Sequence, residues 1–297
     1  MSLLIAGGAK DPNLSVLVAA AERAEVPIVD LRVPAGGSPA FHWDLRTGNV
    51  SLRGDIVRPS AAFIRMDVFE ALDQPRPDVS TRALGWYQAI TGWAMATGIR
   101  HCNRNISPVA ANKPATLALA RECGLRVPTT AISNQPGPAS GAPRIAKPVA
   151  GGGYCVELGE ALENHPTAAP LAMPAIVQER LTSPEVRVYV IGESAIAFEL
   201  RSASLDYRQR QDAEIISLPE PPPETKALRR LMDALAMDFG AADFKTDPDT
   251  GDLVFLELNT SPMFARFDYA SEGRLSRFLV ESLCPTGTVA TMAAPAR

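Results

Sequence analysis

The sequence predicts a mixed α/β (α+β) protein with more than one domain. Three observations support this class. Near the N-terminus, apolar runs of strand length alternate with segments of helical periodicity. In the second half, paired apolar runs separated by short turns indicate antiparallel hairpins. The third observation is the composition, because the chain of 297 residues is 46% hydrophobic and 21% charged. A chain of this length and composition can bury a large core and is expected to divide into about two or three lobes.

The N-terminal part is predicted to be one α/β domain with the bounds 1–110. Residues 3–33 have the pattern strand, helix, strand, and their first turn, "AGGAKDP", lacks the GxGxxG pattern of dinucleotide-binding domains. A structural role is therefore favoured for this βαβ unit. A hairpin around Thr47-Gly48-Asn49 follows, then a core strand "AAFIRMDVF" in which Arg65 is the one conspicuous charge. The next helix is expected to end at Gly98.

The remaining chain is predicted to form a central subdomain, 111–176, and a C-terminal subdomain, 177–297. A helix capped by Asn112 opens the central part, and a glycine-rich hairpin, "RIAKPVAGGGYCVEL", follows it. The C-terminal part contains a hairpin turning at Gly192-Glu193, a helix, two strands flanking "TDPDTGD", and a terminal helix "EGRLSRFLVESL". Both parts therefore combine helices with antiparallel strands.

Composition excludes several classes of function. Net charge is −4 and the basic residues are scattered, so no nucleic-acid surface is expected. Four cysteines stand far apart without a CxxC pattern and only three histidines are present, which argues against zinc sites and disulfide frameworks. No apolar segment approaches the length of a membrane span, and no targeting segment is evident. We expect a cytoplasmic protein without a membrane partner, and a homodimer from base rates.

Three oxygen-bearing side chains are predicted to converge near the C-terminus, in "GAADFKTDPDTGDLVFLELN". A turn centred near Thr250 places Asp243 opposite Glu257, with Asn259 two residues on, on the same face. Facing carboxylates repel unless a proton or cation lies between them, and such ligands suit Mg²⁺. The alternative is a solvated sheet face with Lys245 as partner. The opposite face is expected to carry a core stripe of Ala242, Phe244, Val254, Leu256 and Leu258.

A second group of residues could bind phosphates. Lys147 lies in a strand that leads into Gly151, Gly152 and a third glycine before a return strand, which excludes a P-loop and allows a flexible lid over phosphates. Lys113, at a helix start, is a second candidate cation. An ordinary glycine turn and a solvated surface lysine are the alternatives.

A third group could bind a nucleoside. The strand "AIVQERL" ends in Gln178, Glu179, Arg180 and Leu181, where backbone groups are available to a base edge, and Glu185 could take ribose hydroxyls. Arg201 ends the apolar run "AIAFEL" and is expected on the sheet face near the other groups, where it could hold a phosphoryl group. A solvated loop with surface ion pairs is the alternative for the first segment.

These pieces, in this order, resemble the ATP-grasp superfamily over roughly residues 110 to 280. The resemblance is carried by "NKPATLALARECGLRVPTT", "IAKPVAGGGYCVEL", "IVQERLTSPEVRVYVIGESAIAFELR" and "AADFKTDPDTGDLVFLELN". It implies an N-terminal α/β domain, a small lid domain and a C-terminal domain, with ATP clamped between the last two. It also implies ATP and Mg²⁺ as cofactors.

The resemblance assigns a role to most of the candidate residues. Lys113 and Lys147 would contact the ATP phosphates, residues 178–181 the adenine, and Glu185 the ribose. Asp243, Glu257 and Asn259 would bind Mg²⁺. Arg187 and Arg201 would lie near the γ-phosphate and the acyl phosphate.

Within the superfamily, the chain looks most like the ligases that modify ribosomally made peptides, the microviridin or graspetide type, and next like ligases of the RimK type, which add glutamate to ribosomal protein S6. Those peptide ligases tend to follow the metal-binding Asn with Pro-Asn-Gly-Gln-Trp, whereas this chain has "TSPMF" at 260–264. The departure lies beside the reaction centre, so it bears on the acceptor. Arg65, Arg208 and Arg210 are candidates for gripping the carboxylate substrate, and an exposed basic loop is an equal alternative for the last two.

The predicted activity is an ATP-dependent, ADP-forming ligase that joins a carboxylate to an amine or hydroxyl, with a peptide or amino acid as substrate. Phosphorylation gives an acyl phosphate, which the acceptor attacks, so no side-chain nucleophile is required. Two alternatives stay open: a small-molecule kinase with the same ATP site, and a nucleotide-binding regulator that has lost catalysis.

Overall fold

The computed structural model describes residues 1–73, 77–135, 142–150, 154–163, 170–202, 204–205 and 213–285. Its contacts divide the chain into two compact units: Met1–Arg104 together with Met263–Arg297, and Asn105–Pro262. The last segment is thus grouped with the N-terminal part of the chain, whereas the sequence analysis assigns it to the subdomain 177–297. Within the described ranges, no helix combines the length and the apolar character that crossing a bilayer requires.

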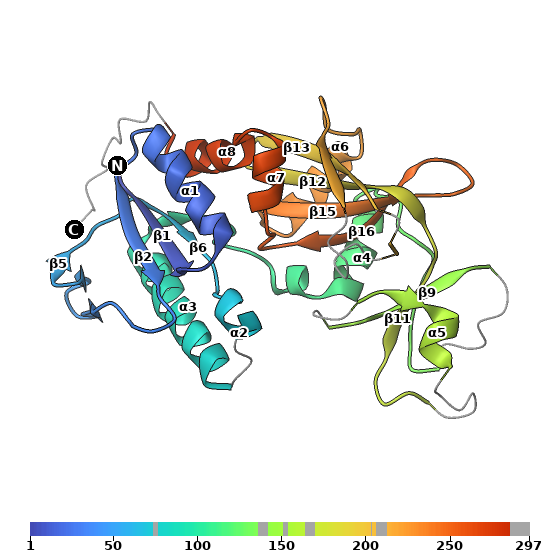
Figure 1. Ribbon diagram of the computed structural model, residues 1–297, viewed down its shortest axis with the longest axis horizontal. Coiled ribbons are helices and arrows are strands. Elements are labelled where there is room, and N and C mark those ends of the chain that lie inside the picture. Colours follow the sequence, from blue (N-terminus) through green and yellow to red (C-terminus); the bar gives the residue numbers. More distant parts are fainter. Residues whose placement is uncertain are drawn as a thin grey trace. The chain divides into compact units, whose positions relative to one another are not determined.

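The first unit is built on a parallel sheet with the strand order β2-β1-β6-β7. The predicted βαβ unit is confirmed, because α1 (Pro12–Arg23) joins two strands that pair in parallel. In Figure 1, α1 and α8 lie on one side of this sheet and α3 on the other. The bounds are β1 (Leu3–Gly8), β2 (Ile28–Val33), β6 (Ala61–Ile64), β7 (Arg100–His101), α3 (Pro77–Thr97) and α8 (Arg274–Leu283).

Smaller elements complete the first unit. The predicted hairpin around Gly48 is confirmed by the pairing of Trp43 with Val50, and a third short strand extends it. Phe264, within the "TSPMF" segment, is fully buried and packs edge-on against Phe63. The bounds are β3 (Phe41–Trp43), β4 (Val50–Leu52), β5 (Asp55–Ile56), α2 (Phe69–Asp73) and α7 (Ala265–Ala270).

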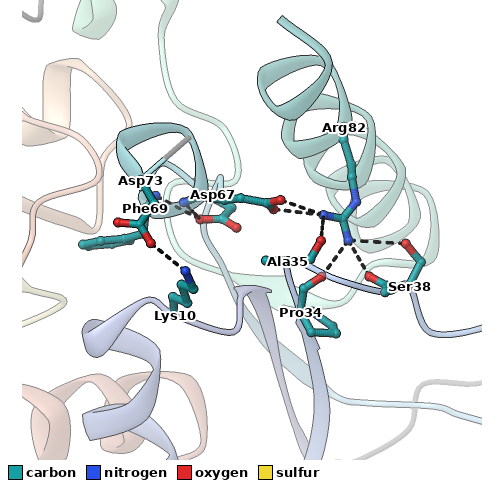
Figure 2. A network of polar contacts seen from close by, with 10 residues as sticks. Lys10, Pro34, Ala35, Ser38, Asp67, Phe69, Asp73 and Arg82 are labelled. Atoms are coloured by element: carbon teal, nitrogen blue, oxygen red, sulfur yellow. Dashed lines mark hydrogen bonds and ion pairs between the residues drawn. The ribbon is translucent and has the colours of Figure 1, made fainter. Parts of the chain in front are cut away.

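Arg82 of α3 fixes the glycine- and proline-rich loop that follows β2. Its Nη2 donates to the carbonyl of Pro34 at 2.7 Å and also to that of Gly37, and its Nη1 donates to the carbonyl of Ala35 at 3.2 Å. The same Nη1 donates to the Glu70 carboxylate at 2.9 Å. Figure 2 shows the guanidinium at the centre of these contacts. A loop with little side-chain packing of its own thus acquires a defined shape.

Arg65 lies in the interior of the first unit. Its side chain is 4% exposed, and its Nε donates to the fully buried Asp11 carboxylate at 2.9 Å. Asp11 also caps α1 by accepting from the Asn13 backbone N–H. Asn13 in turn accepts from the backbone N–H groups of Phe264 and Ala265, at 2.6 and 2.8 Å. Arg65 therefore belongs to a buried polar network that ties the start of α1 to the start of α7.

Replacing Arg65 by methionine is expected to destabilise the protein by about 3 to 5 kcal/mol, because it leaves the Asp11 carboxylate buried without its cation. Urea unfolding followed by circular dichroism measures this change. The control is Lys10→Met, which removes the cation of the exposed Lys10–Asp73 pair and is expected to leave the midpoint almost unchanged. An Arg65→Met protein as stable as the wild type would contradict the structural role.

The second unit contains two antiparallel sheets. The smaller one has the strand order β10-β9-β11-β8, and α5 packs on one of its faces, with Leu158 of the helix against Ala146 and Val177 of the strands. The labels β9, β11 and α5 locate this sheet in Figure 1. The bounds are β8 (Thr130–Ser133), β9 (Arg144–Pro148), β10 (Val156–Glu157), α5 (Leu158–Leu162) and β11 (Ala175–Glu179).

The larger sheet has the strand order β14-β13-β12-β15-β16. Helices α4 and α6 cover one face, with Leu117, Leu228, Phe244 and Phe255 in the shared core. The predicted N-terminal cap of α4 is confirmed, because Asn112 accepts from the Ala115 N–H. At the other end, Gly124 follows the helix with φ +85°. The bounds are α4 (Lys113–Glu122), β12 (Thr182–Ile191), β13 (Ser194–Arg201), β14 (Glu214–Ser217), α6 (Thr225–Ala234), β15 (Phe239–Thr246) and β16 (Leu253–Asn259). A short 3₁₀ helix, Pro108–Ala111, precedes α4.

The pairing of β15 with β16 confirms one prediction and corrects another. Asp243 lies opposite Glu257, as predicted, but the next pair is Phe244 with Phe255, so a β-bulge leaves Leu256 without a direct partner. The bulge shifts the alternation of side chains by one residue. Phe255, rather than Leu256, consequently fills the core beside Phe244, at 5.7 Å between ring centroids. The predicted core position of Leu256 is therefore wrong.

Candidate active site

A cleft in the second unit is lined by residues from α4 and from both sheets. Most of the residues predicted to bind nucleotide or metal line it: Lys113, Lys147, Gln178, Glu179, Leu181, Glu185, Arg187, Asp243 and Glu257. Residues that are separated by up to 144 positions in the sequence thus share one cavity. The sheets supply most of the charged groups, because alternate residues of each strand point to the same face, and α4 supplies Lys113.

Asp243 is held by the neighbouring strand β12. Arg187 is its direct cross-strand partner and makes a two-pronged contact, Nε to Oδ1 at 2.5 Å and Nη2 to Oδ2 at 2.8 Å. The Asn259 amide donates to Oδ2 at 3.1 Å. Both side chains of the Arg187–Asp243 pair are largely buried, at 12% and 7% exposure. The geometry of this carboxylate is therefore fixed from two sides.

Glu257 forms an ion pair with a lysine of helix α4. Lys113 occupies the first turn of α4, and its Nζ donates to Glu257 Oε2 at 2.9 Å. Pro114 and the Asn112 cap fix the start of this helix, which directs Lys113 into the cleft. Facing carboxylates are thus neutralised by Arg187 and Lys113, which removes the repulsion that their pairing would otherwise cause.

The chemistry of this donor set fits Mg²⁺. Among the described residues, no group of three or more His, Cys, Asp or Glu side chains could hold a metal ion. The set here consists instead of two carboxylates and the Asn259 amide, hard oxygen donors of the kind Mg²⁺ takes alongside water and substrate phosphates. Asp243 Oδ1 accepts from Arg187 Nε, which leaves this oxygen a second lone pair, and the Asn259 amide donates through its nitrogen, which leaves its oxygen for a cation. Asp243, Glu257 and Asn259 are therefore the residues that would hold the ion.

Lys147 is a partly buried cation of the cleft. Its position on β9, opposite Ile176, partly removes its ammonium from solvent, and this burial lowers its pKa below the ordinary value of 10.5. The negative charge of Glu257 acts in the opposite direction, and the nearby Lys113 lowers the pKa further. A partly buried ammonium with such a pKa is poised to gain from an incoming polyanion.

ATP binding is expected to weaken as the pH rises. The decline is expected at a lower pH than the one at which an ordinary lysine loses its proton. Because the pKa of Lys147 is lowered, the ammonium loses its proton, and with it its attraction for phosphates, before pH 10.5 is reached. Calorimetric titration of ATP across the alkaline range measures the effect. Lys147→Arg keeps its charge throughout that range and is expected to flatten the profile. An equally steep decline in Lys147→Arg would contradict the assignment.

The cleft also contains an apolar slot beside polar backbone. Ile145 lines it from the smaller sheet and Leu181 from the residues that follow β11. Leu256 lines it from the larger sheet, and Leu205 from the chain after β13. Glu179 is engaged with the start of β8, where its side chain accepts from the Thr129 N–H at 2.9 Å. Glu185 lies 3.7 Å from the Lys245 ammonium, which also donates to the Leu205 carbonyl. A flat aromatic ring with a polar edge matches this combination.

Several predicted residues are not brought to the cleft. Arg201 follows Leu200, the partner of Glu185, so strand alternation turns it to the opposite face, where its exposed side chain pairs with Glu199 at 2.6 Å. Arg180 points to Glu157 at 3.0 Å, although its backbone continues the predicted segment. Arg65 belongs to the first unit and its buried network. Gly151, Gly152, Arg208 and Arg210 lie outside the described residues.

The structure adds residues that the sequence analysis did not assign to the site. Lys245 shares its face with Asp243, two residues earlier, so strand periodicity alone could have placed it there. Leu256 enters the cleft through the bulge, for which the sequence carries no clear signal. Cys155 and Ile145 also line the cavity. Of these two residues, the sequence could have indicated Ile145, because it lies two residues before Lys147 on β9 and therefore shares its face.

The structure has the ATP-grasp fold, which confirms the fold predicted from the sequence. No protein-family model matches the chain, and no curated protein matches its sequence. Solved structures match it over almost its whole length. The ATP-grasp ligase PsnB, complexed with a minimal precursor, Mg and ADP, superposes with a TM-score of 0.71 at 25% identity, covering 95% of this chain and 97% of that one.

Two further similar structures, of a ligase and a macrocyclase, also contain a bound peptide. A RiPP-associated ATP-grasp ligase from Chryseobacterium gregarium, in complex with ADP and a leader and core peptide, matches with a TM-score of 0.74 at 16% identity, covering 96% of this chain and 97% of that one. The macrocyclase MdnC from Microcystis aeruginosa, bound to the precursor peptide MdnA, matches with a TM-score of 0.69 at 18% identity, covering 96% and 99%. At such identities the likeness concerns the fold.

Proposed function

We propose that this protein is an ATP-dependent, ADP-forming ligase that joins a carboxylate of a peptide to an amine or hydroxyl. The observation that carries the proposal is the convergence of Asp243 and Glu257 with Lys113 and Lys147 in one cleft of an ATP-grasp fold, with Asn259 hydrogen-bonded to Asp243. The PsnB complex and the Chryseobacterium gregarium complex each contain ADP together with a precursor or peptide, which supports the same pair of substrates here. Because the reaction uses ATP, we place it in the cytoplasm.

The residues of the cleft have separable tasks in this reaction. Lys113 and Lys147 hold the phosphates by charge, and the apolar slot around Ile145 and Leu256 holds the base. Glu185, fixed beside Lys245, is placed for the ribose hydroxyls. Arg187 keeps Asp243 in position and presents positive charge where the γ-phosphoryl group leaves the nucleotide. Bound Mg²⁺ would neutralise charge on the transferring phosphoryl group.

The chemistry needs positioning more than a nucleophilic side chain. The substrate carboxylate takes the γ-phosphoryl group of ATP, which gives ADP and an acyl phosphate. The acceptor amine or hydroxyl then attacks the acyl carbon, and phosphate leaves with the pair of electrons from the broken bond. A cleft with buried charges and apolar walls limits water, which would otherwise hydrolyse the acyl phosphate.

Release of ADP tests the proposal. The purified protein is incubated with ATP, Mg²⁺ and, in turn, amino acids, dipeptides and a candidate precursor peptide, and products are identified by mass spectrometry. A ligase yields ADP, free phosphate and a product lighter than its precursors by one water. A phosphorylated product would instead identify a kinase, and nucleotide binding without ADP release under any condition would support a regulator.

A further inference from the structure

Gln178 carries a polar atom that the protein itself leaves unsatisfied. The residue is 1% exposed, and its Oε1 is buried without a hydrogen-bond partner. A buried acceptor without a donor loses its hydrogen bond to water and gains none in return, so an atom of this kind is unusual in a folded protein. Gln178 is also one of the residues that line the cleft. The atom is therefore a candidate for a contact that a ligand supplies.

The strand register directs the Gln178 side chain toward the cleft. On β11 it lies opposite Ile145, and Ile176 lies opposite Lys147, so these side chains share one face of the smaller sheet. Ile145 and Lys147 also line the cleft. Val177, between them in the chain, points the other way and packs with Leu158. Gln178 thus faces the same space as the partly buried ammonium of Lys147.

A neighbouring threonine decides which end of the amide faces outward. Coordinates alone do not distinguish the oxygen from the nitrogen of a glutamine amide, so hydrogen bonding must do so. Thr130, the cross-strand partner of Gln178, donates its only hydroxyl proton to the Pro128 carbonyl at 2.7 Å. The hydroxyl can therefore only accept from Gln178, and Nε2 donates to it at 2.9 Å. Rotating the amide by half a turn would place Gln178 Oε1 against the Thr130 hydroxyl oxygen, and neither atom would have a proton to donate to the other.

The resemblance to ATP-grasp enzymes already places Gln178 among the residues that contact adenine; we propose that Thr130 sets the nucleobase preference of the cleft by fixing the orientation of the Gln178 amide. The hydrogen bonds from Thr130 to the Pro128 carbonyl and from Gln178 Nε2 to Thr130 fix the amide, so that Gln178 Oε1 is held as a hydrogen-bond acceptor. That acceptor pairs with the exocyclic amine of adenine and opposes the oxo group that hypoxanthine and guanine carry at the same position. Gln178 reads the base, and Thr130 is a positioning residue that acts through it. This inference rests on the proposed use of ATP.

The test compares ATP with ITP, which differ in the six-membered ring of the base. Adenine in ATP carries an exocyclic amine, and hypoxanthine in ITP carries an oxo group at the same position and an adjacent ring N–H. Dissociation constants are measured by calorimetry for the wild type, Thr130→Val and Thr130→Ser. The wild type and Thr130→Ser are expected to prefer ATP by about 10- to 100-fold, the range expected when a buried acceptor gains or loses its donor. In Thr130→Val the amide can rotate, and the preference is expected to fall to within about 3-fold.

Two further variants separate this role from a structural one. Thr246→Val removes another hydroxyl that donates to a proline carbonyl, that of Pro184 in the larger sheet, and is expected to keep the full preference. Gln178→Met removes the acceptor itself and is expected to abolish the preference whether or not Thr130 is intact. Because Thr130 is exposed, valine is expected to be tolerated there, and Thr130→Ala provides the same test if it is not.

The outcomes distinguish this inference from the function beneath it. If the wild type binds ATP and ITP equally well, the base-reading role is overturned while the ATP-dependent reaction stands. If the wild type prefers ATP and Thr130→Val retains the whole preference, the positioning role of Thr130 is overturned. If the wild type binds neither nucleotide, both the inference and the proposed function fall.

Discussion

Glu257→Gln is expected to lower the rate of ADP formation by about 100- to 1,000-fold, the effect of removing one preorganised charge-stabilising group. Glutamine keeps the size of the side chain and an oxygen, so packing against Leu256 and the hairpin is preserved. It removes the negative charge that pairs with Lys113 and would hold Mg²⁺. The measurement is steady-state ADP release at saturating peptide and ATP.

The matched control for this variant is Glu214→Gln. Glu214 is an exposed carboxylate on β14 of the same sheet and lies outside the cleft. Its replacement is expected to leave turnover unchanged. If Glu257→Gln retained wild-type turnover over a range of Mg²⁺ concentrations, the assignment of Glu257 to the metal would be contradicted.

Lys147→Met is expected to weaken ATP binding by about 10- to 100-fold, the magnitude of one lost hydrogen bond to a charged group. Methionine fills the same space and removes a partly buried ammonium whose pKa is lowered chiefly by burial. Without nucleotide, the variant is therefore expected to be no less stable than the wild type, because the cost of burying the charge disappears. Calorimetry of ATP binding and thermal unfolding without ATP measure the two effects.

Arg201→Gln is the control for the loss of a cation. The Arg201 side chain is exposed and paired with Glu199 on the face of the sheet opposite Arg187. Its replacement is expected to leave ATP binding and turnover unchanged. Loss of turnover in Arg201→Gln, or wild-type ATP affinity in Lys147→Met, would contradict the roles assigned to these two residues.

Local rules predicted the centre of the site well. Once the turn near Thr250 is recognised, antiparallel pairing determines that Asp243 faces Glu257, and the structure confirms it. The Asn112 cap and Pro114 likewise predict the start of α4, and with it the position of Lys113. Both predictions depend on residues that are close in sequence, where the geometry of one turn is sufficient.

The predictions that failed depend on shifts of register and on distant partners. Leu256 was expected in the core, and a single extra residue in β16 moves it to the cleft. Arg201 ends its strand one residue after the position that shares a face with Glu185. Arg65 pairs with Asp11, which lies 54 residues earlier. The sequence shows that Arg65 is a charge within an apolar strand, but it does not show which carboxylate is buried beside it. Such pairings appear only once the sheet is assembled.

The central claim is that a substrate carboxylate is activated by transfer of the γ-phosphoryl group. The most direct test labels the carboxylate oxygens of a peptide that supports ADP release with heavy oxygen and follows the label by mass spectrometry. An acyl phosphate mechanism transfers one labelled oxygen to the released phosphate for each bond formed. Bond formation with unlabelled phosphate would contradict the mechanism.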